Sequence, residues 1–595
     1  MDVSGKHLHN RSLENYSTDE FGFELGLLAS KVAYYNFEWR FLTIVMFNTM
    51  HVIGLNTFLK HYQQSVIVKL GRYLPARRAA VPQIVIFGED SSEISSTLRW
   101  AIKAKYDSSG KFIIICAFLD QDCDEQKIFQ TLQSLYILNV VLLKLSTKNN
   151  TALAYSYDII DHGKCTNNVP YSLHLLPACK NDDCFKNLYP ERLSNFHGCA
   201  LRMSTIEQAP FMYLHNGTKR PSGIDGDIMM LAANMLNATL MLTTPADGGD
   251  AGHFSNNNWT GSLGDVYNDR RQASVCSAPL SSTKYGNFQI SFPYYSMDIV
   301  WATSLPPQKA SWEKLLSPLS VYLRVTLFCF FIVITFVNTL CKSNIWRQVR
   351  RAFEIEPPKY SFLFFSWVLF LGFPILREPA RKSFVVTIYT WIWFCFIIRS
   401  AYQAALINSL KQPAYLNNLE TFLDVFRLGH RYGGLVALKE YYTADRPIYD
   451  NWVVVDLDHF PVTLDNIIFG TTDFVLASNK DAIKHHLMKY NGTKQLQIIP
   501  EKIVNSPTVI YFKKFSPLAV PVNTVLRTAL EGGFIQRIHD KYLAHDRKLF
   551  QRVRNRRPEP LRMSHFAGSF VLLILGWSVS ATYFAVEYVC GNLAD

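Results

Sequence analysis

The sequence predicts a multi-domain membrane protein in which an α/β region is divided in two by a block of membrane helices. Three observations predict it: long apolar runs, strand-like runs alternating with amphipathic helices on both sides of them, and basic residues gathered in the loops between them. Of the 595 residues, 49% are hydrophobic and 14% aromatic, which is high for a soluble protein. The net charge is +12, but we find no glycine-rich phosphate loop and no aromatic-interleaved basic stretch, so we expect no nucleic-acid partner.

Three apolar runs are predicted to cross the membrane. They lie within residues 321–341, 383–410 and 566–589, and each offers the roughly 20 residues that a spanning helix needs. The run within residues 361–374 is too short, because runs of about 10–14 residues suit re-entrant segments. Backbone that enters the membrane without crossing it must be shielded by protein or line a water-filled cavity. We therefore expect a re-entrant pore loop there, with a short buried or interfacial helix as the alternative.

Basic residues orient these helices. By the positive-inside rule, the loops after the first run and after the short run are cytoplasmic, and the large flanking segments lie outside. The basic residues in these loops are Lys342, Arg347, Arg350, Arg351, Lys359, Arg377, Arg381 and Lys382. Glycosylation sequons give independent support, because all of them fall in the outside segments. Among them are Asn149, Asn216, Asn237, Asn258 and Asn491.

Residues 1–80 are predicted to form an N-terminal extension. An outside N-terminus normally needs a signal peptide, but the first forty residues are polar and charged. The weakly apolar stretch 40–59 is therefore a possible signal or anchor region, although Asn48, His51 and Asn56 interrupt it.

Short buried strands alternate with amphipathic helices in three further segments. In residues 81–198 the runs "QIVIFGED", "KFIIICAFLD" and "LNVVLLKLS" read as strands, which predicts a reduced N-terminal α/β region. Residues 199–312 and 411–560 repeat the pattern on either side of the membrane block. We expect these two segments to be the halves of one bilobed ligand clamp whose closure would pull on a gate.

No enzyme signature is found. There is no local Ser-His-Asp or Cys-His arrangement and no pair of carboxylates placed for catalysis, so we expect no catalytic residue. Cys179 and Cys184 lack the partners of a zinc site, and His485-His486 reads as a solvated helix face, so we expect no metal or cofactor.

The order of parts resembles the ionotropic glutamate receptor superfamily, in which a periplasmic-binding-protein-like clamp is split by a pore. The stretch "AYQAALINSL" resembles the family's gate motif. An ungapped count back from it places the family's pore-helix Phe-Ser on Phe365 and Ser366. "KEYY", from Lys439 to Tyr442, and "APLSSTKYGNFQISFPYYS" resemble ligand-domain segments. The gate positions that match in register are Tyr402, Ala404, Leu406 and Leu410.

The ligand-binding positions depart from the family pattern. The arginine that holds the ligand α-carboxylate bidentately falls on Gly286. The Ser-Thr pair that meets the distal acid falls on Ala437 and Leu438, and the acid that pairs with the ligand amine falls on Ala477, beside Ser478. A zwitterion in such a cleft would lose its charge partners, so glutamate is a poor candidate and a neutral, amine-type or lipid ligand is as open as an acid. The family positions that persist are Pro279 and Ser281.

The pore positions depart as well. The position that controls divalent permeation falls on Gly372, beside Phe373, and either its carbonyl coordinates ions or it is a plain turn glycine. Arg399 lies in the second predicted span, one turn before Tyr402. An arginine in a membrane helix suggests a functional site, here one that would disfavour cations, and the alternative is snorkelling or a partner carboxylate.

Loss of the anchors on a preserved channel frame resembles the divergent insect-type ionotropic receptors of chemosensory neurons. The resemblance implies a ligand-gated cation channel subunit in the plasma membrane of a sensory dendrite, assembled with co-receptor subunits in a heterotetramer. Its ligand would be a small-molecule tastant or odorant. The alternative is a membrane-anchored ligand-binding or assembly subunit that does not conduct.

Overall fold

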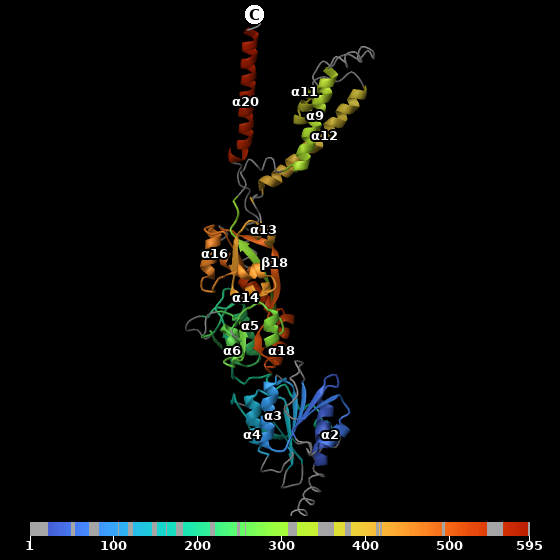
Figure 1. Cartoon of the computed structure of the whole chain (residues 1–595), viewed down its shortest axis with the longest axis vertical. Helices are drawn as coiled ribbons and strands as arrows, with labels where there is room; N and C mark the ends of the chain where they lie inside the picture. Colours follow the sequence, from blue (N-terminus) through green and yellow to red (C-terminus); the bar gives the residue numbers. More distant parts are fainter. Residues whose placement is uncertain are drawn as a thin grey trace, which may run out of the picture. The chain divides into compact units, whose positions relative to one another are not determined.

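The computed structural model describes residues 22–592 except 49–53, 71–81, 105, 117–122, 146–151, 162, 174–181, 215–219, 247–249, 256, 308–317, 343–361, 375–381, 412–415, 417–418, 491–493 and 544–562. The chain divides into two compact units (Figure 1). One contains residues 1–304 and 421–550, and the other contains residues 305–420 and 551–595. The sequons at Asn149, Asn216 and Asn491, and the basic inner loops apart from Lys342 and Lys382, lie outside the described residues.

The N-terminal part of the first unit is a seven-stranded sheet with the order β2-β1-β3-β4-β5-β6-β7. Its first five strands pair in parallel, and β6 and β7 complete it antiparallel. Continuous apolar runs such as "QIVIFG" and "VVLLKL" form fully buried strands, as expected where both faces of a parallel sheet are covered. The strands are β1 (Thr43–Phe47), β2 (Val66–Leu70), β3 (Gln83–Gly88), β4 (Lys111–Cys116), β5 (Val140–Leu145), β6 (Ala152–Tyr157) and β7 (Pro170–Leu173).

Helices cover this sheet and begin where the sequence supplies a cap. The Asp90 side chain accepts from the Glu93 amide at the start of α3, and Asp124 does the same for Gln126 and Lys127 at the start of α4. The helices are α2 (Leu55–His61), α3 (Ser91–Lys103) and α4 (Glu125–Ser134), with a further helix over residues 22–36. The stretch 40–59, considered above as a signal or anchor region, supplies the buried strand β1 and the start of α2. Residues 43–47 of this stretch are buried in the sheet.

Disulfides join Cys116 to Cys123 and Cys165 to Cys199. Cys184 is also disulfide-bonded, whereas Cys276 is a buried thiol. Cys199 directly precedes the first strand of the next sheet, so its disulfide ties the N-terminal region to the clamp that follows.

The first lobe of the clamp is a five-stranded sheet with the order β13-β19-β12-β8-β9. Strand β19 comes from beyond the membrane helices and pairs antiparallel with β12 and β13. The strands are β8 (Ala200–Thr205), β9 (Thr239–Thr243), β12 (Ala273–Val275), β13 (Phe288–Ile290) and β19 (Tyr511–Lys513). The main helices are α5 (Ile224–Met235), α6 (Gly261–Tyr267), α7 (Ser282–Asn287) and α18 (Ala519–Glu531).

The second lobe is another five-stranded sheet, with the order β16-β15-β17-β14-β18. Strand β14 precedes the helices of residues 321–411 in the chain, and it pairs with β17 and β18, which follow them. The strands are β14 (Tyr295–Thr303), β15 (Arg431–Gly434), β16 (Val453–Val454), β17 (Phe474–Asn479) and β18 (Gln497–Thr508). The helices are α13 (Phe422–Arg427), α14 (Val436–Lys439), η2 (Glu440–Tyr442), α15 (Arg446–Asp450), α16 (Phe460–Phe469) and α17 (Lys480–Met488).

An aromatic cluster holds the two ends of the second lobe that connect to the other unit. Trp301, near the end of β14, stacks on Phe422, the first residue of α13, with ring centroids 4.5 Å apart. Tyr432 and Trp452 contact the same indole. Such a packed aromatic group stabilises the point where the chain leaves the lobe and the point where it returns.

The second unit contains α9 (Val321–Lys342), α11 (Phe362–Leu371), α12 (Lys382–Lys411) and α20 (Met563–Asn592). Helices α9, α11 and α12 form one bundle (Figure 1), in which Phe331 of α9 stacks on Trp367 of α11 at 4.7 Å. Two described segments are long and apolar enough to cross a membrane, Ile388–Ser409 and Phe566–Val589. The apolar segment of α9, Val321–Phe336, is shorter, so a third span and a re-entrant loop stay predictions.

Candidate ligand-binding pocket

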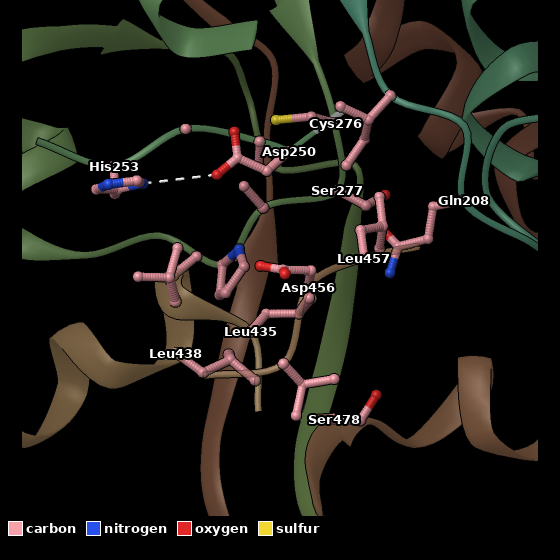
Figure 2. Close-up of a pocket in the computed structure, with 18 of the residues that line it drawn as sticks. Gln208, Asp250, His253, Cys276, Ser277, Leu435, Leu438, Asp456, Leu457 and Ser478 are labelled. Carbon is pink, nitrogen blue, oxygen red and sulfur yellow. Dashed lines mark ion pairs between the residues drawn. The ribbon is translucent and has the colours of Figure 1, made fainter. Parts of the chain in front are cut away.

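A pocket of about 480 Å³ lies between the two lobes of the clamp. Figure 2 shows Asp250, Cys276 and Ser277 of the first lobe on one side, with Leu438 and Ser478 of the second lobe on the other. A volume of this size is that of a small-molecule site.

Apolar side chains make up much of the wall. Leu435, Val436, Ala437 and Leu438 line it from the segment where β15 runs into α14. Further apolar contributions come from Ile206, Ala278, Pro279, Met297, Ile299, Val454, Val455 and Leu457. The pocket therefore offers apolar contact on both sides, with a few polar groups to orient a ligand.

The charged groups of the pocket are carboxylates. Asp250 comes from the first lobe, and Asp456 and Asp458 come from the loop that follows β16. His253 and His459 also line the pocket, and His253 Nδ1 lies 3.5 Å from Asp250 Oδ2 (Figure 2). Among the described lining residues, none is lysine or arginine. The pocket thus presents negative charge to a ligand.

A buried carboxylate stands behind the pocket wall. Asp225, in the first turn of α5, is 1% exposed and accepts hydrogen bonds from Ser277 and, at 2.9 Å, from the Tyr294 hydroxyl. Burial raises the pKa of Asp225 to about 6, although both hydrogen bonds oppose that rise. Because Ser277 also lines the pocket, a change of charge at Asp225 acts directly on the residue that forms the wall.

Beside the pocket the two lobes touch each other. Ser281 Oγ donates to Glu440 Oε2 at 2.8 Å, and the Tyr441 hydroxyl donates to the Leu280 carbonyl at 2.7 Å. Lys284 is fully buried, donates to the Pro279 carbonyl at 3.0 Å and lies 3.8 Å from the same Glu440 oxygen. Burial lowers the pKa of Lys284, and the Glu440 carboxylate opposes that shift. We call this group, Ser281, Lys284, Glu440 and Tyr441, the lobe bridge.

The hinge between the lobes consists of two chain segments bonded to each other. The Ser291 amide donates to the Ile510 carbonyl at 2.9 Å, and the Ile510 amide donates to Ser291 Oγ at 2.8 Å. A further contact between the lobes joins the Tyr213 hydroxyl to His485 Nε2 at 2.9 Å. Burial lowers the pKa of His485, and the neighbouring His486 lowers it further.

The structure brings together some of the sequence-predicted ligand positions. Pro279, Ala437, Leu438 and Ser478 line the pocket. The remaining three, Ser281, Gly286 and Ala477, are not among its lining residues.

Each of these three positions has a local explanation. The Ser281 side chain caps α7, where it accepts from the Lys284 amide at 3.3 Å, and it also joins the lobe bridge. Gly286 lies in α7 with open space around its Cα, and Ala477 is fully buried in β17.

Sequence reasoning missed the carboxylates and the pairing of Lys284 with Glu440. Asp250, Asp456 and Asp458 lie in loops, and the signal that could have pointed to the latter two is the acidic pattern "VVVDLDH" directly after a strand. Nothing local distinguishes Glu440 or Lys284 from surface charges, because their pairing joins segments more than 150 residues apart. The sequons at Asn237 and Asn258 are exposed.

The predicted pore and gate residues lie in the helical bundle. Phe365 and Ser366 are in α11, and the Trp391 indole of α12 donates to the Ser366 carbonyl at 3.4 Å. Gly372 and the exposed Phe373 follow α11 directly. The gate residues all lie on α12: Arg399, Tyr402, Ala404, Leu406 and Leu410.

Together the fold and the pocket define a two-lobed α/β ligand-binding clamp interrupted by helices, two of which suit a membrane. Two comparisons give this class a family context. A family model described as "Putative ionotropic receptor, ligand binding domain" matches residues 48–195, which form most of the seven-stranded N-terminal region. The chain is also 25% identical to Glutamate receptor 3.1 of Oryza sativa subsp. japonica over 309 residues, which are 48% of this chain and 30% of the plant receptor.

Both matches support a relation to the ionotropic glutamate receptor superfamily. The matched part is less than a third of the plant receptor, and the family model covers the N-terminal region and not the pocket.

Proposed function

We propose that this protein is a subunit of a ligand-gated cation channel and serves as a chemosensory receptor for a small tastant or odorant. The observation that carries the proposal is the pocket between two lobes whose sheets are each built from both halves of the interrupted chain. A ligand that draws the lobes together moves the second lobe, from which the chain enters α9 and to which it returns after α12. Binding energy is thereby available to bias a gate.

The ligand we propose is an amine or another organic cation, and not glutamate. A free amino acid brings a carboxylate, which requires a cationic partner when it is desolvated. The described pocket lining supplies three aspartates and no lysine or arginine, which disfavours an acid. An ammonium group facing Asp456 would gain charge-assisted hydrogen bonds, while the apolar wall around Leu435 and Leu438 accommodates a hydrocarbon body.

The assembly we propose is a heterotetramer with co-receptor subunits in the plasma membrane of a sensory dendrite. Two observations support this assembly. The chain keeps the order of parts of a glutamate receptor, with a pocket, a helical bundle and a gate-like helix, but the residues at its ligand-anchoring positions differ from those of glutamate receptors. In such an assembly this chain would tune the response, because its pocket differs from that of an amino-acid receptor.

The test compares ligands of matched shape in cells that express the full chain with and without candidate co-receptor subunits. Currents are recorded to a panel in which each primary amine is paired with the alcohol and the carboxylic acid of the same carbon skeleton. We expect currents to amines. In Asp456→Asn the half-maximal concentration should rise about tenfold to a hundredfold, because charge-assisted hydrogen bonds contribute about 1.5–3 kcal/mol.

The matched control is Asp183→Asn, which removes a carboxylate from the N-terminal region, far along the chain from the pocket. Responses confined to acids, or an Asp456→Asn variant with unchanged sensitivity to amines, would contradict the ligand class. Amine-dependent thermal stabilisation of the purified chain without current in any combination would instead favour a non-conducting binding subunit.

A further inference from the structure

One face of α12 packs against the short helix α11. Trp391, Cys395 and Arg399 are spaced four residues apart and therefore share a face of the helix. The Trp391 indole donates to the Ser366 carbonyl at 3.4 Å, and Cys395 is 2% exposed. Arg399, the next residue on this face, is thus directed toward the end of α11.

The Arg399 guanidinium lies against Gly372, the residue that directly follows α11. Gly372 has a φ of +91°, and its amide bonds to the Val368 and Leu369 carbonyls, both at 3.1 Å. A Cβ at Gly372 would overlap Nη1 of Arg399 and lie 2.8 Å from its Cζ. Only a glycine therefore permits both this backbone conformation and the close approach of the guanidinium.

The carboxyl end of α11 is electrostatically suited to a cation. The last carbonyls of a helix carry a partial negative charge, which attracts positive groups. In a cation pore this end could stabilise a passing ion, but here a guanidinium of the same chain occupies the position. The segment from Phe362 to Pro374 contains no acidic residue to offset it.

We propose that Arg399 is the residue that sets charge selectivity at this turn: its tethered positive charge repels cations there, and it repels divalent cations more than monovalent ones. The repulsion scales with the charge of the ion, so the second charge doubles the opposing energy. This inference rests on the proposed function, because it requires that the turn at Gly372 line an ion pathway.

The first test measures ion permeation in cells that express the full chain together with the co-receptor subunits that give current. Reversal potentials are compared in external sodium and in external calcium for wild type, Arg399→Gln and Arg399→Lys. We expect Arg399→Gln to raise the calcium-to-sodium permeability ratio about tenfold, which corresponds to about 1.4 kcal/mol, while Arg399→Lys stays near wild type. Arg427→Gln, at an exposed side chain of α13, is the matched control. An unchanged ratio in Arg399→Gln would overturn the proposal.

The second test does not need current. A cysteine replaces the exposed Phe373 in the full chain. The rates of labelling by anionic and cationic methanethiosulfonates of similar size are then compared. The chain that keeps Phe373 gives the background labelling of the other cysteines. We expect the anionic reagent to react about tenfold faster, and this preference to disappear when Arg399→Gln is added. Equal rates, or absence of labelling, would overturn the proposal. A charge preference in a chain that passes no current supports the role of Arg399 and counts only against conduction.

Discussion

The lobe bridge and the pocket are bounded by the same two lobes but handle charge in opposite ways. In the bridge, Glu440 receives a hydrogen bond from Ser281 and lies beside the fully buried Lys284, so the protein neutralises its own charge. In the pocket, the described lining residues set three aspartates against no lysine or arginine. The contrast shows that charge is balanced within the protein at the lobe bridge, whereas the described lining residues of the pocket include no lysine or arginine to balance its three aspartates.

Breaking the bridge should have the largest effect. In Glu440→Gln the buried Lys284 loses its counter-charge, and removal of one partner of a buried pair is strongly destabilising. Glu440 is partly exposed, so we expect a loss of about 2–3 kcal/mol, measured as a lower melting temperature of the full chain in detergent. The double variant Lys284→Met with Glu440→Gln should recover most of this loss. Glu531→Gln, on an exposed part of α18, serves as the control, and an equal loss there would refute the pairing.

Neutralising the carboxylate behind the pocket should have an intermediate effect that depends on pH. The pKa of Asp225 is raised from 3.8 to about 6 by burial, so wild type is stabilised below pH 4 and loses that stability as the pH rises through 6. Asp225→Asn should therefore be more stable than wild type at pH 7.5, by about 2 kcal/mol, with no advantage near pH 4. Melting temperatures across this range test it. If Asp225→Asn were less stable than wild type both near pH 4 and at pH 7.5, then Ser277 and Tyr294 would require the carboxylate itself.

Removing the contact between Tyr213 and His485 should have the smallest effect. Burial lowers the pKa of His485, so the folded chain resists protonation and loses stability as the pH falls below about 6.5. His485→Gln should flatten this acid dependence by at most about 1 kcal/mol, because the histidine is only half-buried. Melting curves between pH 5 and 7 provide the measurement, with His61→Gln in the N-terminal region as control. Parallel curves for wild type and His485→Gln would rule out this histidine as the source.

Much of the fold could be predicted because its signals are local. Buried strands such as β3, β4 and β5 are continuous apolar runs, and a polar, capped helix follows each of the first two. The mixed α/β architecture predicted from this alternation is confirmed. The place of β14 in the second lobe could not be read in the same way, because its partners β17 and β18 lie beyond the membrane helices in the chain.

The pocket was less predictable, because its composition depends on long-range contacts. The positions 279, 437, 438 and 478 were inferred by resemblance, and the fold places them on the pocket wall. Ser281 was expected to meet the ligand, but its hydroxyl meets Glu440, 159 residues away. Asp456 and Asp458 have no distinguishing local pattern beyond acidic residues after a strand. Only the folded second lobe shows that they line the pocket between the two lobes.

The interleaving of the two sheets has a consequence for biosynthesis. When a ribosome has made β14, the neighbours of that strand in the sheet, β17 and β18, have yet to be translated, and α9, α11 and α12 come first. The second-lobe sheet therefore stays incomplete while these helices are being made. The second lobe completes its sheet only after β18 has been made, and the first lobe only after β19, so a formed pocket requires strands from both sides of the interrupting helices.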